Sequence, residues 1–243
     1  MSIAETIWLI RDRQIHESYH RLIRRMLTDR AFALGLACHP AYSRVGDWIV
    51  PERGTRVLEL GCANGKYVAL LSTLGFEIVG VDPLRFPEWE EIADGRPVTF
   101  MGGVYAESLP FEDSSFDHIF CGGALFYFDD PAKALDEMRR VIKPTGRLVL
   151  RTVNRDNPYT RRTGLPMDPA TKKLHTMDEL VQLVDDAGFV VANRFSYGFI
   201  PPYCSNLWWY LVSIWIPLSW QEWLSDRLPE GHRSGLTIFA TPK

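Results

Sequence analysis

Short apolar runs alternate with amphipathic segments along most of the chain, which predicts strands separated by helices. The expected strands lie at 56–60, 77–81, 97–101, 117–121, 147–153, 190–198 and 235–241. The expected helices lie at 65–74, 87–93, 131–142 and 177–187. This alternation is typical of a parallel sheet with helices on both faces, so we expect one α/β domain over residues 1–243.

A further helix is expected before the first strand. Over residues 4–30 the side chains of Ile15, Tyr19, Leu22 and Met26 fall on one helical face. This spacing indicates an amphipathic helix that packs against the rest of the domain.

The amino-acid composition bears on the partners and the cellular setting and does not change the predicted fold. The chain has 243 residues, 46% hydrophobic content and a net charge of −3. This balance gives no electrostatic case for a nucleic-acid partner, which would require a clustered basic face. The four cysteines are widely spaced and form no C-x-x-C pair, which favours a reduced, cytoplasmic setting.

The first chemical signal is the turn that follows the strand at 56–60. Gly61 and Gly65 lie in this turn, which opens directly into the next helix. Glycine has no Cβ and tolerates positive φ, so the bare backbone can approach a ligand closely. The free N–H groups at the start of the helix point toward the same place and favour an anion there.

The second signal is Asp82, which ends the strand at 77–81. An acid at this strand end can accept hydrogen bonds from both hydroxyls of a ribose, as in nucleotide-binding α/β folds. A glycine turn and a ribose acid together indicate a nucleoside cofactor.

The spacing argues against two nucleotide-binding patterns. In the dinucleotide pattern G-x-G-x-x-G the three glycine positions hold Gly61, Ala63 and Lys66, so two of the three fail. The P-loop pattern also fails, because Tyr67 follows Gly65-Lys66 where Ser or Thr is required. An NAD-dependent oxidoreductase is therefore disfavoured.

The turn resembles motif I of the class I S-adenosylmethionine (SAM)-dependent methyltransferases, acidic-x-Gly-x-Gly-x-Gly. Glu59, Gly61 and Gly65 match this motif, and Ala63 replaces the middle glycine. Three later segments resemble the family in the same order: A-E-x-L-P-F-x-D-x-S-F-D at 106–117, the helix and R-V-L-K-P-G-G passage at 135–150, and the helix ending in A-G-F at 177–189. The resemblance covers roughly residues 50 to 198.

The resemblance implies a Rossmann-like, seven-stranded, mostly parallel sheet, whose last strand is antiparallel and lies beside strand six. It also implies SAM as the cofactor, and it places the cofactor-binding residues at Glu59, Gly61, Ala63, Asn64, Gly65, Asp82, Pro83, Leu84, Ala106, Glu107, Cys121 and Gly122.

These residues carry different expected roles. The loop 61–65 faces the methionine end of the cofactor, and Asp82 the ribose. Pro83 and Leu84 border the adenine, and Ala106 and Glu107 contact its ring and amino group. Cys121 and Gly122 border the sulfonium, where Cys121 is expected to be a small buried residue. Tyr105 stands where family members often carry Asp.

Methyl transfer requires mainly that a nucleophile be aligned with the methyl group and that water be excluded. A general base is needed only for an acceptor that is protonated at working pH. The candidates are Tyr127, which follows strand four where many relatives have histidine, and His16 and His20, four residues apart on the first helix. A packing role for Tyr127 and a solvated pair of histidines are the alternatives. Relatives use this first helix as a lid, here residues 1–45.

No metal site is expected, because the histidines lack Cys, Asp or Glu partners at ligand spacing.

The segment 200–232, before the last strand, is rich in tryptophan. Five of the eight tryptophans fall within 208–223, and the apolar run at 207–220 is too short to span a bilayer. One interpretation is an insertion that caps the site and packs its aromatic side chains into the core. The other is an apolar acceptor pocket or a peripheral contact with lipid through 207–223.

We therefore expect SAM-dependent methyl transfer to a small, hydrophobic acceptor, at oxygen in preference to nitrogen or carbon. A non-catalytic SAM- or nucleoside-binding protein is the alternative. The acceptor and the oligomeric state stay open at this point.

Overall fold

The computed structural model describes residues 19–39, 42–49, 54–163, 170–198 and 218–243. Over these ranges a seven-stranded sheet forms the centre of the molecule, in the order β3-β2-β1-β4-β5-β7-β6. The strands are β1 (Arg56–Leu60), β2 (Glu77–Asp82), β3 (Val98–Gly102), β4 (Phe116–Gly122), β5 (Ile142–Val153), β6 (Phe189–Tyr197) and β7 (Gly235–Pro242).

The strand directions match the predicted architecture. The first five strands pair in parallel, and β7 lies antiparallel between β5 and β6. The expected antiparallel last strand beside strand six is therefore confirmed. The chain order reverses between β1 and β4, which is where α/β sheets of this kind open to a ligand.

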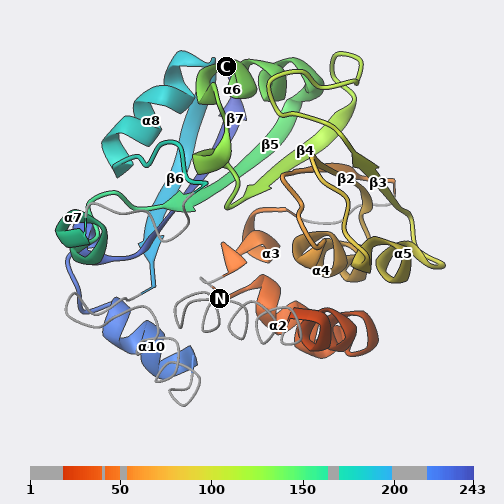
Figure 1. Ribbon diagram of the computed structural model, residues 1–243, viewed down its shortest axis with the longest axis horizontal. Helices are drawn as coiled ribbons and strands as arrows, with labels where there is room; N and C mark the ends of the chain where they lie inside the picture. The colour runs from red at the N-terminus through yellow and green to blue at the C-terminus, as the bar shows by residue number, and fades with distance from the viewer. Residues whose placement is uncertain (1–18, 40–41, 50–53, 164–169, 199–217) are drawn as a thin grey trace, which may run out of the picture.

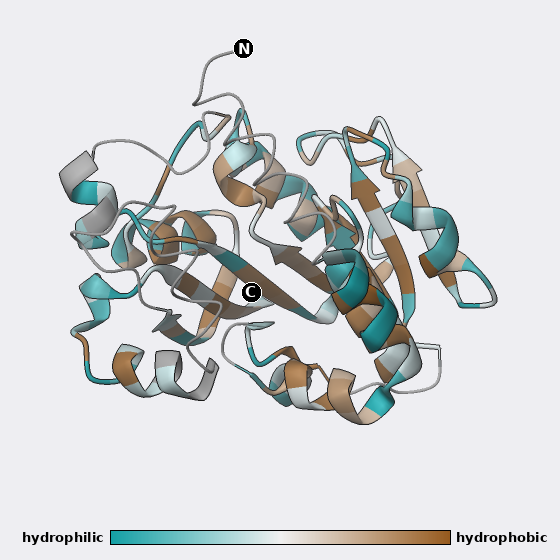
Figure 2. Ribbon diagram, turned by 60° about the horizontal axis from the view of Figure 1, so that its bottom comes forward, coloured by the Kyte–Doolittle hydropathy of each residue, from teal (hydrophilic) through white to brown (hydrophobic). Residues whose placement is uncertain are grey.

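Helices cover both faces of the sheet (Figure 1). One face carries α2 (Arg30–Ala37), α3 (Val45–Trp48), α4 (Lys66–Leu74) and α5 (Glu88–Ala93), and the other carries α6 (Pro131–Val141) and α8 (Met177–Asp186). Each face has its own buried cluster of apolar side chains. The strands are largely brown and the outward faces of several helices are teal in Figure 2, as this two-sided burial requires.

The predicted helix over 4–30 is wrong at its carboxyl end. Residues 19–28 are helical, but the helix ends at Thr28, and Asp29 caps a separate helix, α2. The Asp29 carboxylate accepts a 3.0 Å hydrogen bond from the Phe32 amide. This capping bond satisfies an otherwise free N–H at the start of a new helix. Residues 1–18 of the expected lid lie outside the described ranges.

Several short elements were not expected from the sequence. They are η2 (Leu125–Tyr127), α7 (Pro158–Thr163), α10 (Leu218–Ser225) and η3 (Glu230–His232). Helix α10 falls within the tryptophan-rich segment, of which residues 200–217 lie outside the described ranges. Trp220 and Trp223 of α10 are 66% and 52% exposed, so neither packs into the core. Within the described part of the chain, no helix is long and apolar enough to cross a membrane.

Candidate cofactor and acceptor site

A cavity of about 470 Å³ lies at the carboxyl ends of β1 and β2, next to the point where strand order reverses. Its volume is within the range of small-molecule sites. Seven of the residues expected from the sequence to bind the cofactor or act as a base line it: Gly61, Asp82, Pro83, Leu84, Ala106, Glu107 and Tyr127. The other lining residues are Leu60, Val81, Phe86, Val104, Tyr105, Ala124, Phe128, Asp129, Ala170 and Lys172.

The loop after β1 has an alternating left-handed backbone. Gly61, Ala63 and Gly65 have φ values of 68°, 43° and 78°. A Cβ at Gly61 would collide with the side chain of Ala124, and one at Gly65 would lie 2.7 Å from the Ile92 side chain. Glycine is therefore required at 61 and 65 both by conformation and by space. Ala63 adopts a conformation that costs a non-glycine residue free energy.

The carboxylate of Asp82 is fixed in orientation at the wall of the cavity. Its Oδ2 accepts a 2.9 Å hydrogen bond from the Ala63 amide, and its Oδ1 accepts one of 2.9 Å from the Leu84 amide. Each carboxylate oxygen keeps a second acceptor position. The side chain is only 8% exposed, so those free positions meet the cavity and little bulk water.

Glu107 joins the wall to the loop that precedes α6. Its Oε1 accepts hydrogen bonds of 2.9 and 3.2 Å from the amides of Asp129 and Asp130. Asp129 also forms an ion pair with Lys172, and both line the cavity. Sequence reasoning missed Asp129 and Lys172, because the residues lie 43 positions apart and only the fold brings them together.

Six of the expected cofactor residues lie outside the cavity lining: Glu59, Ala63, Asn64, Gly65, Cys121 and Gly122. Ala63, Asn64 and Gly65 complete the loop behind Gly61. The carboxyl of Glu59 is buried under this loop, and desolvation raises its pKa well above the usual range.

Cys121 belongs to the apolar core, as the sequence interpretation favoured. Burial raises the pKa of its thiol to about 12, so the thiol stays protonated and unreactive at neutral pH.

The three candidate bases lie in different surroundings. Tyr127 lines the cavity, with its ring centroid 4.3 Å from that of Phe126. His20 lies 3.7 Å from the carboxylate of Glu91 in a half-exposed pair and does not line the cavity. His16 lies outside the described residues. Among the residues placed here, no group of His, Cys, Asp and Glu is arranged to hold a metal ion.

A cluster of cationic and aromatic side chains on the α4 side of the sheet was also missed. Arg151, at the end of β5, donates hydrogen bonds to the hydroxyl oxygens of Tyr67 and Tyr197. The ammonium group of Lys66 lies 4.6 Å from the ring centroid of Tyr67. One signal was available in the sequence: Arg151 directly follows the apolar run Leu148-Val149-Leu150 near the end of a predicted strand.

Part of the chain matches a known protein family. Residues 58–150 match a family model described as a methyltransferase domain. An uncharacterised methyltransferase of Mycobacterium tuberculosis is 37% identical over 113 residues, 45% of this chain and 44% of that protein. The chain thus spans less than half the length of these curated relatives.

Two further relatives have named activities. A tRNA U34 carboxymethyltransferase of Campylobacter hominis is 34% identical over 107 residues, 42% of this chain and 37% of that protein. A ubiquinone biosynthesis O-methyltransferase of Paracidovorax citrulli is 30% identical over 115 residues, 45% of this chain and 48% of that protein.

Solved structures share the fold over more of the chain. A SAM-dependent methyltransferase of Mesorhizobium loti superimposes with a TM-score of 0.62 at 18% identity, covering 85% of this chain and 99% of that one. A Burkholderia thailandensis 1,6-didemethyltoxoflavin-N1-methyltransferase was solved with bound S-adenosylhomocysteine. It gives a TM-score of 0.55 at 19% identity, covering 100% of this chain and 91% of that one.

The seven-stranded fold and the match over residues 58–150 support a class I SAM-dependent methyltransferase with SAM as the cofactor.

Proposed function

We propose that this protein transfers the methyl group of SAM to a small, hydrophobic acceptor, at an oxygen atom. The observation that carries the proposal is the cavity itself, in which the fixed carboxylate of Asp82 stands beside the Gly61 turn. This arrangement suits the ribose and the methionine end of SAM, because the carboxylate can accept from ribose hydroxyls while the glycine turn admits the chain close by.

We further propose separate duties for the residues around the cofactor. Bound SAM supplies an activated methyl group, so the protein needs chiefly to orient the acceptor and exclude water. Pro83 and Leu84 border the adenine, and Ala106 and Glu107 lie where its edge would be held. Tyr127 faces the cavity from η2 and is the residue proposed to border the acceptor.

A small molecule is preferred to a nucleic acid as the acceptor. The net charge of −3 gives weak attraction for a polyanion, whereas phosphate contacts supply most of the affinity in nucleic-acid complexes. The relatives include both a tRNA-modifying enzyme and a quinone-pathway O-methyltransferase, so an acceptor panel should contain both classes.

A peripheral contact with lipid is a separate proposal supported by α10. Trp220 and Trp223 are exposed on this helix, and the Arg227 guanidinium lies 3.7 Å from the Trp223 ring centroid. Exposed tryptophan beside a cation suits the interfacial region of an anionic bilayer. Flotation with phosphatidylglycerol vesicles should carry the protein upward, and a Trp220→Ser/Trp223→Ser variant should float less. Wild-type protein that stays at the bottom of the gradient contradicts the contact.

The non-catalytic alternative is motivated by Ala63 in the loop and Tyr105 in the wall, both departures from the family pattern. Calorimetry with SAM, S-adenosylhomocysteine and NAD tests cofactor choice, and we expect binding of the first two only. A panel of phenols, quinols and tRNA then tests turnover through S-adenosylhomocysteine formation. Tight cofactor binding with no product from any acceptor would favour the non-catalytic binder, and binding of NAD instead would remove the proposal.

A further inference from the structure

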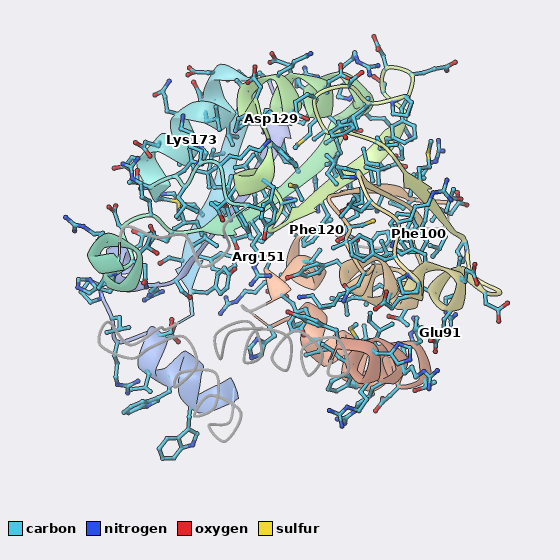
Figure 3. All side chains as sticks on the ribbon, viewed as in Figure 1. Glu91, Phe100, Phe120, Asp129, Arg151 and Lys173 are labelled. Carbon is cyan, nitrogen blue, oxygen red and sulfur yellow. The ribbon has the colours of Figure 1, made fainter. Side chains whose placement is uncertain are left out.

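Arg151 occupies the centre of the carboxyl edge of the sheet. In the sheet, Arg151 pairs with Gly122 of β4 on one side and with Thr237 of β7 on the other. The guanidinium donates from Nη1 to the hydroxyl of Tyr67 and from Nε to the hydroxyl of Tyr197. Figure 3 labels Arg151 near the middle of the molecule.

Two glycines make room for this arrangement. A Cβ at Gly122 would lie 2.9 Å from the Tyr67 ring, and one at Gly235 would lie 2.6 Å from a ring carbon of Tyr197. Side chains at either position would push the rings away from Arg151. Because Gly122 on β4 and Gly235 on β7 have no side chains, the hydroxyl groups of Tyr67 and Tyr197 can both reach the guanidinium of Arg151.

The cluster has hydrogen-bond donors left over. A guanidinium has five N–H donors, and the bonds to the two tyrosines use two of them. Each tyrosine oxygen accepts from Arg151, so its own O–H proton is free to be donated elsewhere. Nη2 of Arg151 makes no hydrogen bond to any residue that the structure describes. These donors suit a planar, doubly accepting anion such as a carboxylate.

The positive charge of the cluster also favours a bound anion. In the described part of the chain, no carboxylate lies within ion-pairing distance of Arg151 or of Lys66. Burial lowers the pKa of Lys66 to about 7, with repulsion from Arg151 as the second cause, while the carboxyl of Glu59 acts in the opposite direction. A partly buried guanidinium with no close carboxylate is costly, and a bound anion removes part of that cost.

The cluster adjoins the cofactor cavity through three consecutive residues. Gly122 lies under the Tyr67 ring, the Gly123 amide donates a 3.0 Å hydrogen bond to the Arg151 carbonyl, and Ala124 packs against Gly61 and lines the cavity. A ligand group at Arg151 is thus on the other side of the β4 terminus from the cofactor.

We propose that Arg151, with the hydroxyl groups of Tyr67 and Tyr197, binds a carboxylate of the acceptor, so that the acceptor class is small aromatic carboxylic acids. The partly exposed ring of Tyr197 supplies apolar surface for the body of such a molecule, and the guanidinium supplies the charge. This inference rests on the proposed methyltransferase function, and it adds the class of substrate.

The test uses benzoate and benzamide, which differ in charge but hardly in shape, on protein saturated with S-adenosylhomocysteine. The arginine Nε–H signals are followed by NMR, and the Arg151 signal is identified by its absence in Arg151→Gln. Benzoate should shift this signal saturably and bind about 10-fold or more tightly than benzamide. Arg151→Gln should abolish the preference, and Arg151→Lys should retain part of it.

A matched control removes a guanidinium from another strand of the same sheet. Arg194 of β6 pairs at 3.4 Å with Asp178 on the surface, and Arg194→Gln should bind benzoate like the wild type. The other arginine signals report whether each variant is folded.

Two outcomes overturn the inference. One is equal binding of benzoate and benzamide. The other is a shift of the Arg151 signal by S-adenosylhomocysteine alone that blocks benzoate, because the subsite would then hold the carboxylate of the cofactor. Failure of the proposed function is seen separately, as absence of a calorimetric signal with S-adenosylhomocysteine.

Discussion

The indole N–H of Trp89 donates a 2.7 Å hydrogen bond to the carbonyl oxygen of Ala63. On the other side of the same residue, the Ala63 amide donates to Asp82. The loop residue with the least favourable backbone conformation is thus held from both sides, by α5 and by the end of β2. An alanine can occupy this left-handed position because its neighbours fix it there.

Replacing Trp89 with phenylalanine should weaken cofactor binding while the fold is retained. The Trp89 ring stacks on Phe100 with centroids 4.8 Å apart, and a phenylalanine keeps that packing but lacks the N–H. Loss of one hydrogen bond of this kind costs about 1 kcal/mol, so the Kd for S-adenosylhomocysteine should rise about 3- to 10-fold by calorimetry.

Trp223→Phe is the control for this substitution, because Trp223 is exposed on α10 and does not contact the loop. Equal Kd values for Trp89→Phe and Trp223→Phe would mean that the indole bond does not hold the loop in its binding conformation.

Asp82→Asn should reduce the affinity for S-adenosylhomocysteine more strongly, by about 1.5–3 kcal/mol. The amide keeps the size of the side chain but loses the charge, and its NH₂ group would face an N–H donor of the loop. Asp136→Asn, on the exposed side of α6, should leave the Kd unchanged. If Asp82→Asn binds as tightly as the wild type, the ribose is held elsewhere.

The sequence predicts the sheet well, because most strands contain a short apolar run bounded by polar or glycine residues. It is less informative at the first helix, where the apolar stripe continues past Asp29 although the backbone is capped there. A capping aspartate within an amphipathic pattern is a local signal that the longer periodicity hides.

Some of the site residues could be predicted from the sequence and others could not. Gly61 and Asp82 could be predicted, because motif I and the strand end are each contained in a few consecutive residues. The pair of Asp129 with Lys172 and the cluster of Arg151 with Tyr67 and Tyr197 depend on strand order and on spaces left by glycines. Such contacts follow from the topology of the sheet and not from any single segment.

Gly61→Ala should impair both folding and binding. The added methyl group would collide with Ala124, and φ at this position is 68°. We expect a loss of about 1–3 kcal/mol in the free energy of unfolding and at least about 10-fold weaker binding of S-adenosylhomocysteine.

Gly35→Ala is the matched control for Gly61→Ala. Gly35 lies within α2, and a Cβ there meets no atom within 4 Å. This substitution should stabilise the protein by about 0.5–1 kcal/mol in urea unfolding and leave the Kd unchanged. A Gly61→Ala protein as stable as Gly35→Ala would show that the loop adapts to the methyl group.

The stability of the protein should fall in mild acid because of His118, on β4. Burial lowers the pKa of His118 to about 4, and Arg147 is the second cause, while Asp117 acts in the opposite direction and Lys143 adds to the lowering. The unfolded chain has a histidine pKa of about 6.5, so it binds more protons than the folded chain between the two values. The free energy of unfolding therefore rises with pH from about 4 to 6.5, and the penalty for protonating His118 is complete below about 4.

His118→Gln should remove this contribution. Relative to the variant, the wild type should lose about 2 kcal/mol as the pH falls from 6.5 to 4, after allowance for partial exposure of the ring. Urea unfolding of both proteins at several pH values measures the difference and cancels the common effect of the carboxylates. His232→Gln, at an exposed position of η3, provides the control. If the free energies of unfolding of the wild type and His118→Gln differ by the same amount across this pH range, protonation of His118 carries no penalty. The acid sensitivity then lies in other groups.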